Sequence, residues 1–462
     1  MADIEKTMFR EYDIRGKVNG NEMNERTARL IGRGFGTMLK RKGVKDCIVG
    51  FDARSYSEML KDSLVRGLVG SGINVVEIGQ VLSPITYFAQ HHLNVRGCAM
   101  VTASHNPNGW TGFKLGYGLS STLVPDDVRE LYGIIRNDDF EGGAGIISKK
   151  NVTESYIKDV LGRVELNKGL KVVVNARNGT AGPIVPGILR RAGCDVIEQF
   201  CGIDTSFPNG DPNPSLEDML QELGEKVRDE GADVGFAYDG DGDRIGMVDE
   251  NGAAVYPDRI MIMLSRLVLQ ESPGAKVVFD VKSSQALAED IKAHGGEPLM
   301  WKTGHSYIKE KVHETNAALG GERSGHIFFM HGYYGFDDAV FSSLKALEYL
   351  SQAGQPVSSV MESAPMYYSS PVIHAPCADQ LKYNVMERIA AKLKERFENV
   401  IDINGARVVF DDGWGLVRPS SNLPVLVLVF EAKTPERLKE IENLFREELA
   451  VFPEVGKEWR NG

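Results

Sequence analysis

Residues 48–55 read IVGFDARS, and similar chemistry returns as VVVNARN at 172–178 and VVFDVKS at 277–283. Each copy is a short apolar run that ends in an aspartate or asparagine, a small or branched residue, a cation and a polar residue. Short continuous runs rich in β-branched residues are typical of buried strands. The three copies therefore predict three related strands, each of which ends in a polar turn.

A helix-like stretch follows each copy, and a second apolar run follows each helix. The helices are expected at 57–70, 182–192 and 285–294, and the second strands at 74–78, 195–200 and 297–301. Strands that alternate with helices in this way form βαβ units and mostly parallel sheets. The repeated Asp or Asn stands at 52, 175 and 280, at intervals of 123 and 105 residues. These intervals have the size of domains, so we expect three related mixed α/β domains.

The chain beyond about residue 366 has a different pattern. Helices are expected at 379–397 and 435–449, around strand-like runs at 400–403, 407–410 and 424–430. Helices grouped around hairpin-forming strands indicate a smaller α+β domain. We therefore expect an α/β protein whose four domains surround a central cleft, with boundaries at 1–148, 149–251, 252–365 and 366–462.

Composition narrows the class of protein. The 462 residues are 42% apolar and 25% charged, as in a folded globular protein, and the net charge of -11 argues against nucleic acid as the main ligand. The N-terminus is acidic and no apolar run reaches about 18 residues, so we expect neither a secretory signal nor a membrane partner. Five scattered cysteines without a C-x-x-C pair are typical of reduced thiols in a cytoplasmic protein.

The first of four loops with reactive side chains is TASHNPNG, at 102–109, directly after an apolar run. Asn-Pro and Asn-Gly mark turns, so Ser104 is expected in a tight loop at a strand end, where open parallel sheets bind ligands. A serine hydroxyl is a weak nucleophile unless a base or cation activates it, and His105 and Lys114 are the candidates. Taken alone, an ordinary turn with a capping serine explains this loop equally well.

The second loop is DGDGDR, at 239–244, directly after a strand-like run. Three carboxylates separated only by glycines repel one another without a cation, and their oxygens suit a hard divalent ion such as Mg²⁺. An EF-hand is the rival, since Glu250 stands at the twelfth position, but Arg244 occupies the sixth, where glycine is required. The sequence therefore predicts a metal site made by Asp239, Asp241 and Asp243.

The third and fourth loops are suited to binding a sugar and a phosphate. In GGERSGH, at 320–326, Glu322 and Ser324 can bind vicinal hydroxyls and His326 can move protons. In RPSSNLP, at 418–424, an arginine fork, two hydroxyls and an amide match the oxygens of a phosphate dianion. Plain structural turns remain the alternative for each loop in isolation.

Together, and in this order, the four loops resemble those of the α-D-phosphohexomutase superfamily, and within it the phosphomannomutase/phosphoglucomutase group. The resemblance covers essentially the whole chain, because FREYDIRG at 9–16, GFK at 112–114 and KTGH at 302–305 are similar to further segments of that family. The resemblance implies reversible transfer of a phosphoryl group between the 1- and 6-positions of glucose or mannose phosphate. It also implies a phosphoserine at Ser104, bound Mg²⁺ and a hexose 1,6-bisphosphate as intermediate and activator.

The resemblance assigns a role to each candidate residue. The metal site consists of Ser104, Asp239, Asp241 and Asp243. Arg15 and Lys114 are the candidates for charge stabilisation and proton transfer at the seryl oxygen. His326, with His305 as the alternative, is the candidate for the proton of the sugar hydroxyl. The substrate-binding set is Tyr12, Arg244, Lys282, Glu322, Ser324, Arg418, Ser420, Ser421 and Asn422.

One departure and three rival functions remain open at this stage. The last loop has Ser421 and Asn422 where this group has N-T and phosphoglucosamine mutases have G-T, and both replacements keep hydrogen-bonding side chains. The rivals are a phosphoglucosamine mutase, a phosphoserine-forming phosphatase and an inactive sugar-phosphate-binding sensor. The choice between glucose and mannose and between monomer and homodimer cannot be predicted from these patterns.

Overall fold

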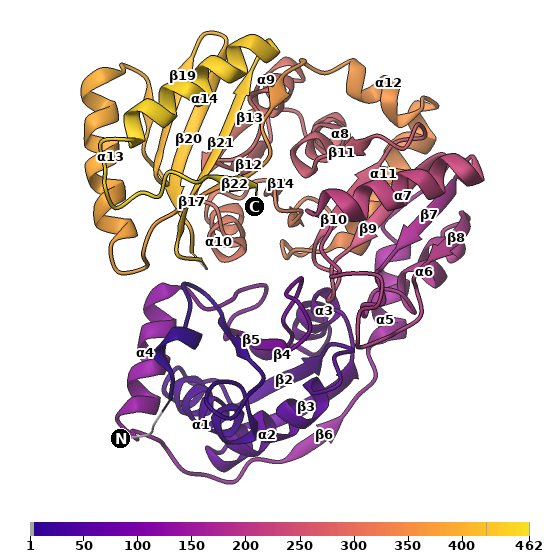
Figure 1. Ribbon diagram of the computed structural model, residues 1–462. Coiled ribbons are helices and arrows are strands. Elements are labelled where there is room, and N and C mark those ends of the chain that lie inside the picture. Colours follow the sequence, from indigo (N-terminus) through magenta and orange to yellow (C-terminus); the bar gives the residue numbers. More distant parts are fainter. Residues whose placement is uncertain (1–3, 422, 462) are drawn as a thin grey trace.

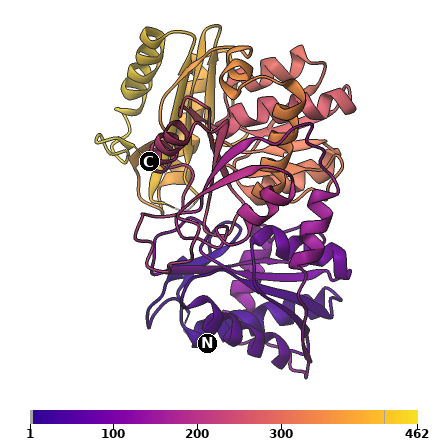
Figure 2. The same ribbon diagram turned by 90° about the vertical axis from the view of Figure 1, so that its right-hand side faces the viewer.

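The protein consists of four sheets with their helices, and residues 4–421 and 423–461 are described by the structure, a computed structural model (Figure 1). The N-terminal part lies at one end of the molecule, with the later parts above it (Figure 2). Three α/β segments and an antiparallel C-terminal segment confirm the predicted fold class. None of the helices among the described residues has the length and hydropathy of a membrane span.

The first sheet has the strand order β1-β5-β4-β2-β3-β6. Strands β4, β2, β3 and β6 run parallel, whereas at one edge β5 is antiparallel to β4 and β1 is antiparallel to β5. Its strands are β1 (Ile14–Lys17), β2 (Asp46–Phe51), β3 (Asn74–Gln80), β4 (Gly97–Val101), β5 (Trp110–Gly116) and β6 (Ile147–Lys149). Its helices are η1 (Lys6–Met8), α1 (Glu25–Arg41), α2 (Ser57–Gly70), α3 (Ser83–Leu93) and α4 (Pro125–Arg136).

The second and third sheets repeat this plan on a smaller scale. Their orders are β11-β10-β9-β7-β8 and β13-β12-β14-β15, and in each the strands at one end of the order are antiparallel. The second contains α5 (Thr153–Leu161), β7 (Lys171–Asn175), α6 (Val185–Arg191), β8 (Asp195–Gln199), α7 (Glu217–Glu230), β9 (Val234–Tyr238), β10 (Ile245–Val248) and β11 (Ala254–Val255). The third contains α8 (Pro257–Glu271), β12 (Lys276–Asp280), α9 (Gln285–Ala293), β13 (Glu297–Trp301), α10 (His305–Thr315), β14 (Leu319–Gly321), β15 (Ile327–Phe329), α11 (Ala339–Ala353) and α12 (Val357–Glu362).

One apolar core joins these three segments. It runs from Ile48 of the first sheet through Val172 and Val277, which belong to the second and third sheets, to Ala364. A separate core lies between the first sheet and α1, α2 and α4, on the other face of that sheet. Because the three segments share buried side chains, their sheets are held in fixed relative positions.

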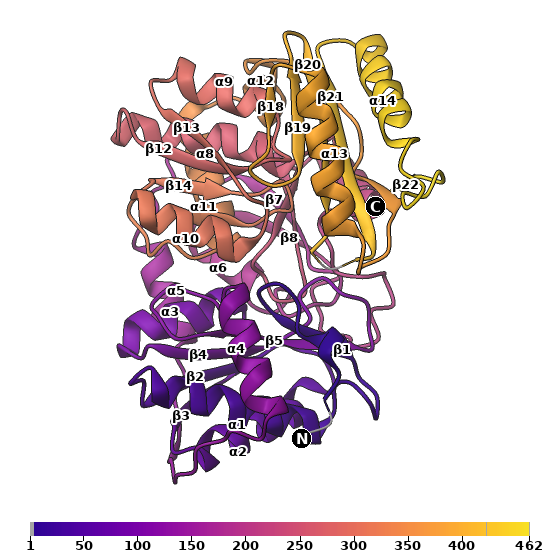
Figure 3. The same cartoon turned by 90° about the vertical axis from the view of Figure 1, so that its left-hand side faces the viewer.

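The fourth sheet is antiparallel, and α13 and α14 cover one of its faces (Figure 3). Its elements are β16 (Tyr368–Ser369), β17 (Ile373–Pro376), α13 (Lys382–Arg396), β18 (Val400–Ile401), β19 (Ala406–Phe410), β20 (Gly413–Pro419), β21 (Val425–Ala432), α14 (Pro435–Leu449) and β22 (Arg460–Asn461). The opposite face packs on the third segment through Trp414, Leu416, Val429 and Val281.

Three expectations about elements need correction. Strand β20 was not predicted, so Arg418 lies on a strand and not in a loop. The glycines that argue against a strand there are required by close packing, since a Cβ on Gly415 would lie 2.3 Å from the Phe445 ring of α14. Helix α6 begins at Val185, after turns at 179–184, and α13 begins at Lys382, so the helices expected at 182–192 and 379–397 are shorter.

Candidate functional site

Three of the four candidate loops occupy the same position in their sheets. Each loop joins a strand of the parallel core to the antiparallel strand beside it: β4 to β5, β9 to β10, and β14 to β15. These loops carry Ser104, the three aspartates, and Glu322 with His326. The repeat therefore places three different sets of side chains at one equivalent position, the carboxyl end of a core strand.

The repeated acid and cation hold two of these loops in place. Asp52 accepts a hydrogen bond from the Ala103 amide at 3.4 Å, and Asp280 accepts one from the Arg323 amide at 3.2 Å. The Arg54 guanidinium donates to the carbonyl oxygens of Ser104 and Asn106. In the second repeat Arg177 instead pairs with Asp218 and Glu222. The residues of the repeat thus fix the backbone on which the reactive side chains stand.

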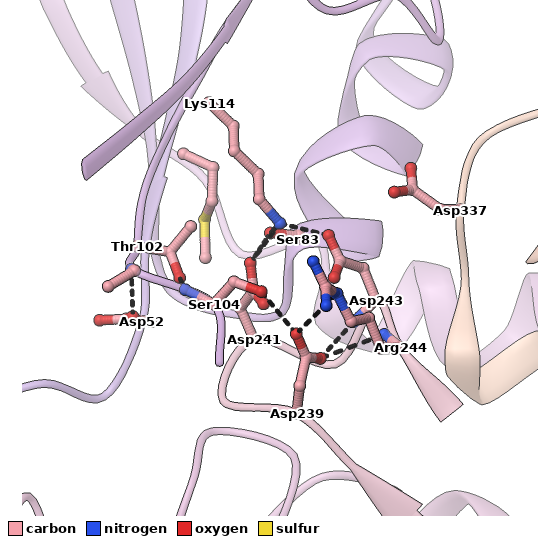
Figure 4. A network of polar contacts seen from close by, with 12 residues as sticks. Asp52, Ser83, Thr102, Ser104, Lys114, Asp239, Asp241, Asp243, Arg244 and Asp337 are labelled. Carbon is pink, nitrogen blue, oxygen red and sulfur yellow. Dashed lines mark hydrogen bonds and ion pairs between the residues drawn. The ribbon is translucent and has the colours of Figure 1, made fainter. Parts of the chain in front are cut away.

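Ser104 is completely buried and its backbone has a φ of 52°, in the left-handed region. Its amide donates to the Thr102 hydroxyl at 2.8 Å, which holds the tight turn. Its hydroxyl donates to Asp239 at 2.7 Å (Figure 4) and lies 3.2 Å from His105 Nδ1. A non-glycine residue in this region costs about 1 kcal/mol or more, so the surrounding contacts hold the serine against strain.

The three aspartates converge beside Ser104. All three side chains are fully buried, and one oxygen of each lies within 4.8 Å of the others. Asp239 accepts hydrogen bonds from the amides of Asp243 and Arg244, both at 3.1 Å. The intervening glycine permits the approach of the two loops, because a Cβ on Gly240 would lie 2.5 Å from the Ser104 carbonyl oxygen.

Lys114 partly compensates the charge of these carboxylates. Its ammonium lies 2.7 Å from Asp241 and also contacts Asp243 (Figure 4). Burial and the neighbouring carboxylates of Asp241 and Asp243 raise the pKa of Asp239 well above its usual range. Burial alone would lower the pKa of Lys114, but the aspartates outweigh burial and raise it. One ammonium does not neutralise three buried carboxylates.

A hard divalent cation fits this arrangement. Within residues 4–421 and 423–461, the Oδ1 atoms of Asp241 and Asp243 are buried and have no hydrogen-bond partner. Buried carboxylate oxygens without donors are costly unless a cation is bound to them, and oxygen ligands suit Mg²⁺. The chemistry of the donor set therefore agrees with the metal predicted from the sequence.

The sugar loop and its neighbours form one wall of a cavity of about 480 Å³. Glu322 accepts a hydrogen bond from the Gly304 amide at 2.6 Å, and burial raises the pKa of its carboxyl. The ring of His305 lies 4.8 Å from that of Tyr12 and 5.3 Å from that of His326, between centroids. Burial lowers the pKa of His305 well below its usual value, so this imidazole is neutral.

Arg15 of the first segment and Arg418 of the fourth segment both line the same cavity. The Arg15 guanidinium donates to Asp13 at 2.6 Å and to the Asn106 side chain at 2.5 Å, so it also braces the serine loop. Arg418 lies near the end of β20 and donates to the Ser421 hydroxyl at 3.4 Å. The Ser420 hydroxyl accepts from the Leu423 amide at 3.1 Å, whereas Asn422 lies outside the described residues.

All the candidate residues that the structure describes lie in or directly beneath this cavity. The lining includes Tyr12, Arg15, Arg244, Lys282, His305, Glu322, Ser324, His326, Arg418, Ser420 and Ser421. Ser104, Lys114 and the aspartates are buried, and the residues that follow Ser104 and Asp243 in the chain, His105 and Arg244, line the cavity. Side chains from all four segments therefore meet at one place.

Two buried residues that the sequence did not indicate orient His326. Its Nδ1 lies 2.9 Å from Asp337, and Asp337 is paired with the Lys309 ammonium at 2.9 Å. On the other side of the ring, Arg244 donates to Nε2 at 3.0 Å. The Asp337 carboxylate favours a proton on Nδ1, and the lone pair of Nε2 accepts the hydrogen bond from Arg244. The role of Asp337 could not be recognised in the sequence, because this residue precedes Asp338, the N-cap of α11, and two aspartates are ordinary at the start of a helix.

We expect Lys309→Met to lower the free energy of unfolding by about 3 kcal/mol or more, because it leaves the Asp337 carboxylate buried without a counterion. Urea unfolding measures this loss. The control is Lys226→Met, which removes a half-exposed ion pair with Glu230 and is expected to change stability by less than about 0.5 kcal/mol. Equal stability of the two variants would contradict a charged Lys309–Asp337 pair.

All four segments of the chain match domains of one known protein family. The chain matches the descriptions "Phosphoglucomutase/phosphomannomutase, alpha/beta/alpha domain I" over residues 6–142, the corresponding domain II over 154–252 and domain III over 256–368. It also matches the C-terminal domain of the same family over 373–448.

Individual relatives agree with these matches over nearly their full length. The chain is 40% identical to a phosphomannomutase/phosphoglucomutase of Pseudomonas putida, over 98% of each chain. It is 38% identical to a phosphoglucomutase of Neisseria gonorrhoeae, over 98% of this chain and 99% of the relative. A crystal structure of a phosphoglucomutase/phosphomannomutase family protein from Burkholderia thailandensis superposes with a TM-score of 0.92 at 36% identity, covering 98% of this chain and 99% of that one.

Proposed function

Since the chain belongs to the phosphoglucomutase/phosphomannomutase family and is a hexose-phosphate mutase, we propose that Ser104 carries the phosphoryl group that moves between the two ends of its substrate. The proposed substrates are the 1- and 6-phosphates of glucose and mannose, and the intermediate is the hexose 1,6-bisphosphate. The observation that carries this proposal is the 2.7 Å hydrogen bond between the Ser104 hydroxyl and Asp239, which joins the nucleophile of one segment to the acidic cluster of the next.

The first step transfers the phosphoryl group from the enzyme to the sugar. The phosphate of a hexose 1-phosphate is bound by Arg418, Ser420 and Ser421, with Asn422 and Lys282 as further ligands. Glu322 and Ser324 form hydrogen bonds with the sugar hydroxyls. Tyr12 and Arg244 line the cavity beside them. These contacts with the phosphate and the sugar place the free 6-hydroxyl next to phosphorylated Ser104, so that the reacting atoms are oriented for transfer.

Proton transfer accompanies this step. We propose that the 6-hydroxyl replaces Arg244 as the hydrogen-bond donor to His326 Nε2, which then takes the hydroxyl proton, and that His305 is the alternative acceptor. The new bond joins the 6-oxygen to phosphorus while the bond from phosphorus to Ser104 Oγ breaks. Lys114 and Arg15 stabilise the negative charge on the seryl oxygen, and the Lys114 ammonium supplies its proton. The bisphosphate then turns over in the cavity, and the reverse reaction returns the other phosphate to Ser104.

Asp239, Asp241 and Asp243, together with an oxygen of phosphorylated Ser104, would hold Mg²⁺. Bound there, the cation offsets the negative charge that develops on the phosphoryl oxygens during transfer. The unpartnered Oδ1 atoms of Asp241 and Asp243 support this ligand set.

The remaining features of the proposal concern the whole chain. We place the domain boundaries at 1–148, 149–251, 252–365 and 366–462, although β6 ends at Lys149 and β11 of the second sheet reaches Val255. We propose that the protein acts in the cytoplasm as a monomer or homodimer. Five buried cysteines with free thiols support a reducing compartment.

Mass spectrometry of the intact protein tests the phosphoserine. After addition of glucose 1,6-bisphosphate, we expect one phosphate on the peptide that contains Ser104, because the free hydroxyl beside the acidic cluster is the acceptor in the priming reaction. Side-by-side turnover of glucose, mannose and glucosamine 1-phosphates identifies the substrate. A phosphate on another peptide, or stoichiometric release of inorganic phosphate, would contradict the proposal, the latter in favour of a phosphatase.

A further inference from the structure

The face of the fourth sheet that is opposite α13 and α14 changes from apolar to polar along its strands. Where it packs on the third segment it is apolar, with Trp414, Leu416 and Val429 around Val281. Further along β20 the same face carries Arg418, two residues beyond Leu416, and there it borders the cavity. Apolar side chains therefore join the two segments, and polar ones project where a ligand binds.

His374 of β17 stands in the same cross-strand row as Arg418. In the register of the sheet, Arg418 is opposite Val427 of β21, and Val427 is opposite His374. Directly opposed residues of antiparallel strands project from the same face. The backbones of the two outer residues of this row are separated by two strand spacings, about 10 Å, and Arg418, Val427 and His374 all line the same cavity.

The surroundings of His374 are those of a ligand contact. It lines the cavity of about 480 Å³ together with Val427, Arg418, Ser420 and Lys282. The residues on either side of it, Ile373 and Ala375, point into the core beneath α13 and α14, so His374 faces the cavity and not the core. Within residues 4–421 and 423–461, its half-buried imidazole has no hydrogen-bond partner.

We propose that His374 is a further binding residue for the phosphate that is not being transferred, beside Arg418 and Lys282. The inference rests on the proposed function, because it assigns a residue to the same substrate. A ring N–H donates to a phosphate oxygen, and the protonated ring adds a positive charge opposite the Arg418 fork. The bisphosphate presents each of its phosphates to this position in turn, so His374 contacts the substrate in both halves of the reaction.

Charged groups around His374 make its protonation depend on the ligand. Burial and the Lys282 ammonium lower its pKa in the free protein. Arg418 lies beyond Val427, and Arg460 of β22 is the directly opposed residue on the other side. All three neighbours are cations, which disfavour a further proton. A bound phosphate dianion reverses this balance and favours the protonated ring.

The test compares His374→Ala and His374→Gln with the full-length wild type, using glucose 1-phosphate as the probe. We expect His374→Ala to raise KM and the calorimetric Kd about tenfold and to change kcat less than twofold, because the contact is the same in ground and transition states. The ratio of the His374→Gln KM to that of wild type is expected to fall toward one between pH 6 and 8, as the wild-type ring loses its proton. The control is His92→Ala, on an exposed position of α3, with no change expected.

Nuclear magnetic resonance of the imidazoles gives a second readout, in which the pKa of His374 is followed in the wild-type protein. The resonance missing in His374→Gln identifies His374, and its pKa is expected to rise when glucose 1-phosphate binds. A KM and Kd within twofold of wild type in His374→Ala, or an unchanged pKa on binding, would overturn the assignment while mutase turnover continued. Absence of turnover in the wild type would instead contradict the proposed function itself.

Discussion

Replacement of Ser104 by alanine is expected to lower mutase turnover by at least about 10⁴-fold, because it removes the hydroxyl that donates to Asp239 and is the proposed acceptor of the phosphoryl group. Steady-state conversion of glucose 1-phosphate, coupled to a dehydrogenase specific for the 6-phosphate, measures the loss. The same variant is expected to acquire no phosphate from glucose 1,6-bisphosphate.

The left-handed backbone of Ser104 requires a matched control. Alanine at a φ of 52° is strained, so Ser104→Gly, which relieves the strain, is expected to lose turnover to the same extent. Ser120 is also buried, with a φ of 53°, but it bonds to the Tyr334 carbonyl and to His91, away from the acidic cluster. Ser120→Ala is expected to keep turnover within about twofold. Wild-type turnover in Ser104→Gly would remove Ser104 from the reaction.

Removal of divalent cations is the second change with a large expected effect. We expect a chelator to lower turnover by about 10³-fold or more, because the phosphoryl oxygens then face three buried carboxylates without a divalent cation. Added Mg²⁺ is expected to restore turnover fully. The chelated protein remains folded, since Lys114 stays paired with Asp241 and Asp243.

Calorimetric measurement of Mg²⁺ binding tests the metal site independently of catalytic turnover. Asp241→Asn is expected to weaken binding by at least about tenfold, because it removes a charged ligand. The control is Asp249→Asn at the other end of β10, where the carboxylate accepts hydrogen bonds from the Asn251 and Ala253 amides. This variant is expected to bind Mg²⁺ like wild type. Full activity in the presence of chelator would contradict the assignment of the aspartates.

The sequence predicted the parts of the site that depend on local chemistry. The strand before each repeated acid, the serine turn and the Asp-Gly alternation follow from short-range rules, and the structure brings Ser104 within hydrogen-bond distance of Asp239. The family resemblance supplied the remaining members, such as Arg15 and Lys282, and both line the cavity.

The parts that could not be predicted depend on long-range packing. Asp337 orients His326 only because β15 lies beside it, and nothing in the sequence distinguishes it from the capping Asp338. Strand β20 was missed because its glycines accommodate α14, which follows later in the chain. Arg418, Val427 and His374 become neighbours only through the pairing register of β20, β21 and β17. Arg418 and His374 are more than forty residues apart in sequence.

The equivalence of the three catalytic hairpins has a consequence for how the protein tolerates change. The three reactive loops leave the carboxyl ends of β4, β9 and β14, so the turns that enter the amino ends of those strands, at 94–96, 231–233 and 316–318, carry no group needed for phosphoryl transfer. Those turns are the natural places for length variation among relatives and for inserting affinity tags or reporter domains, because additions there lengthen the far edge of a sheet and leave the chemistry untouched.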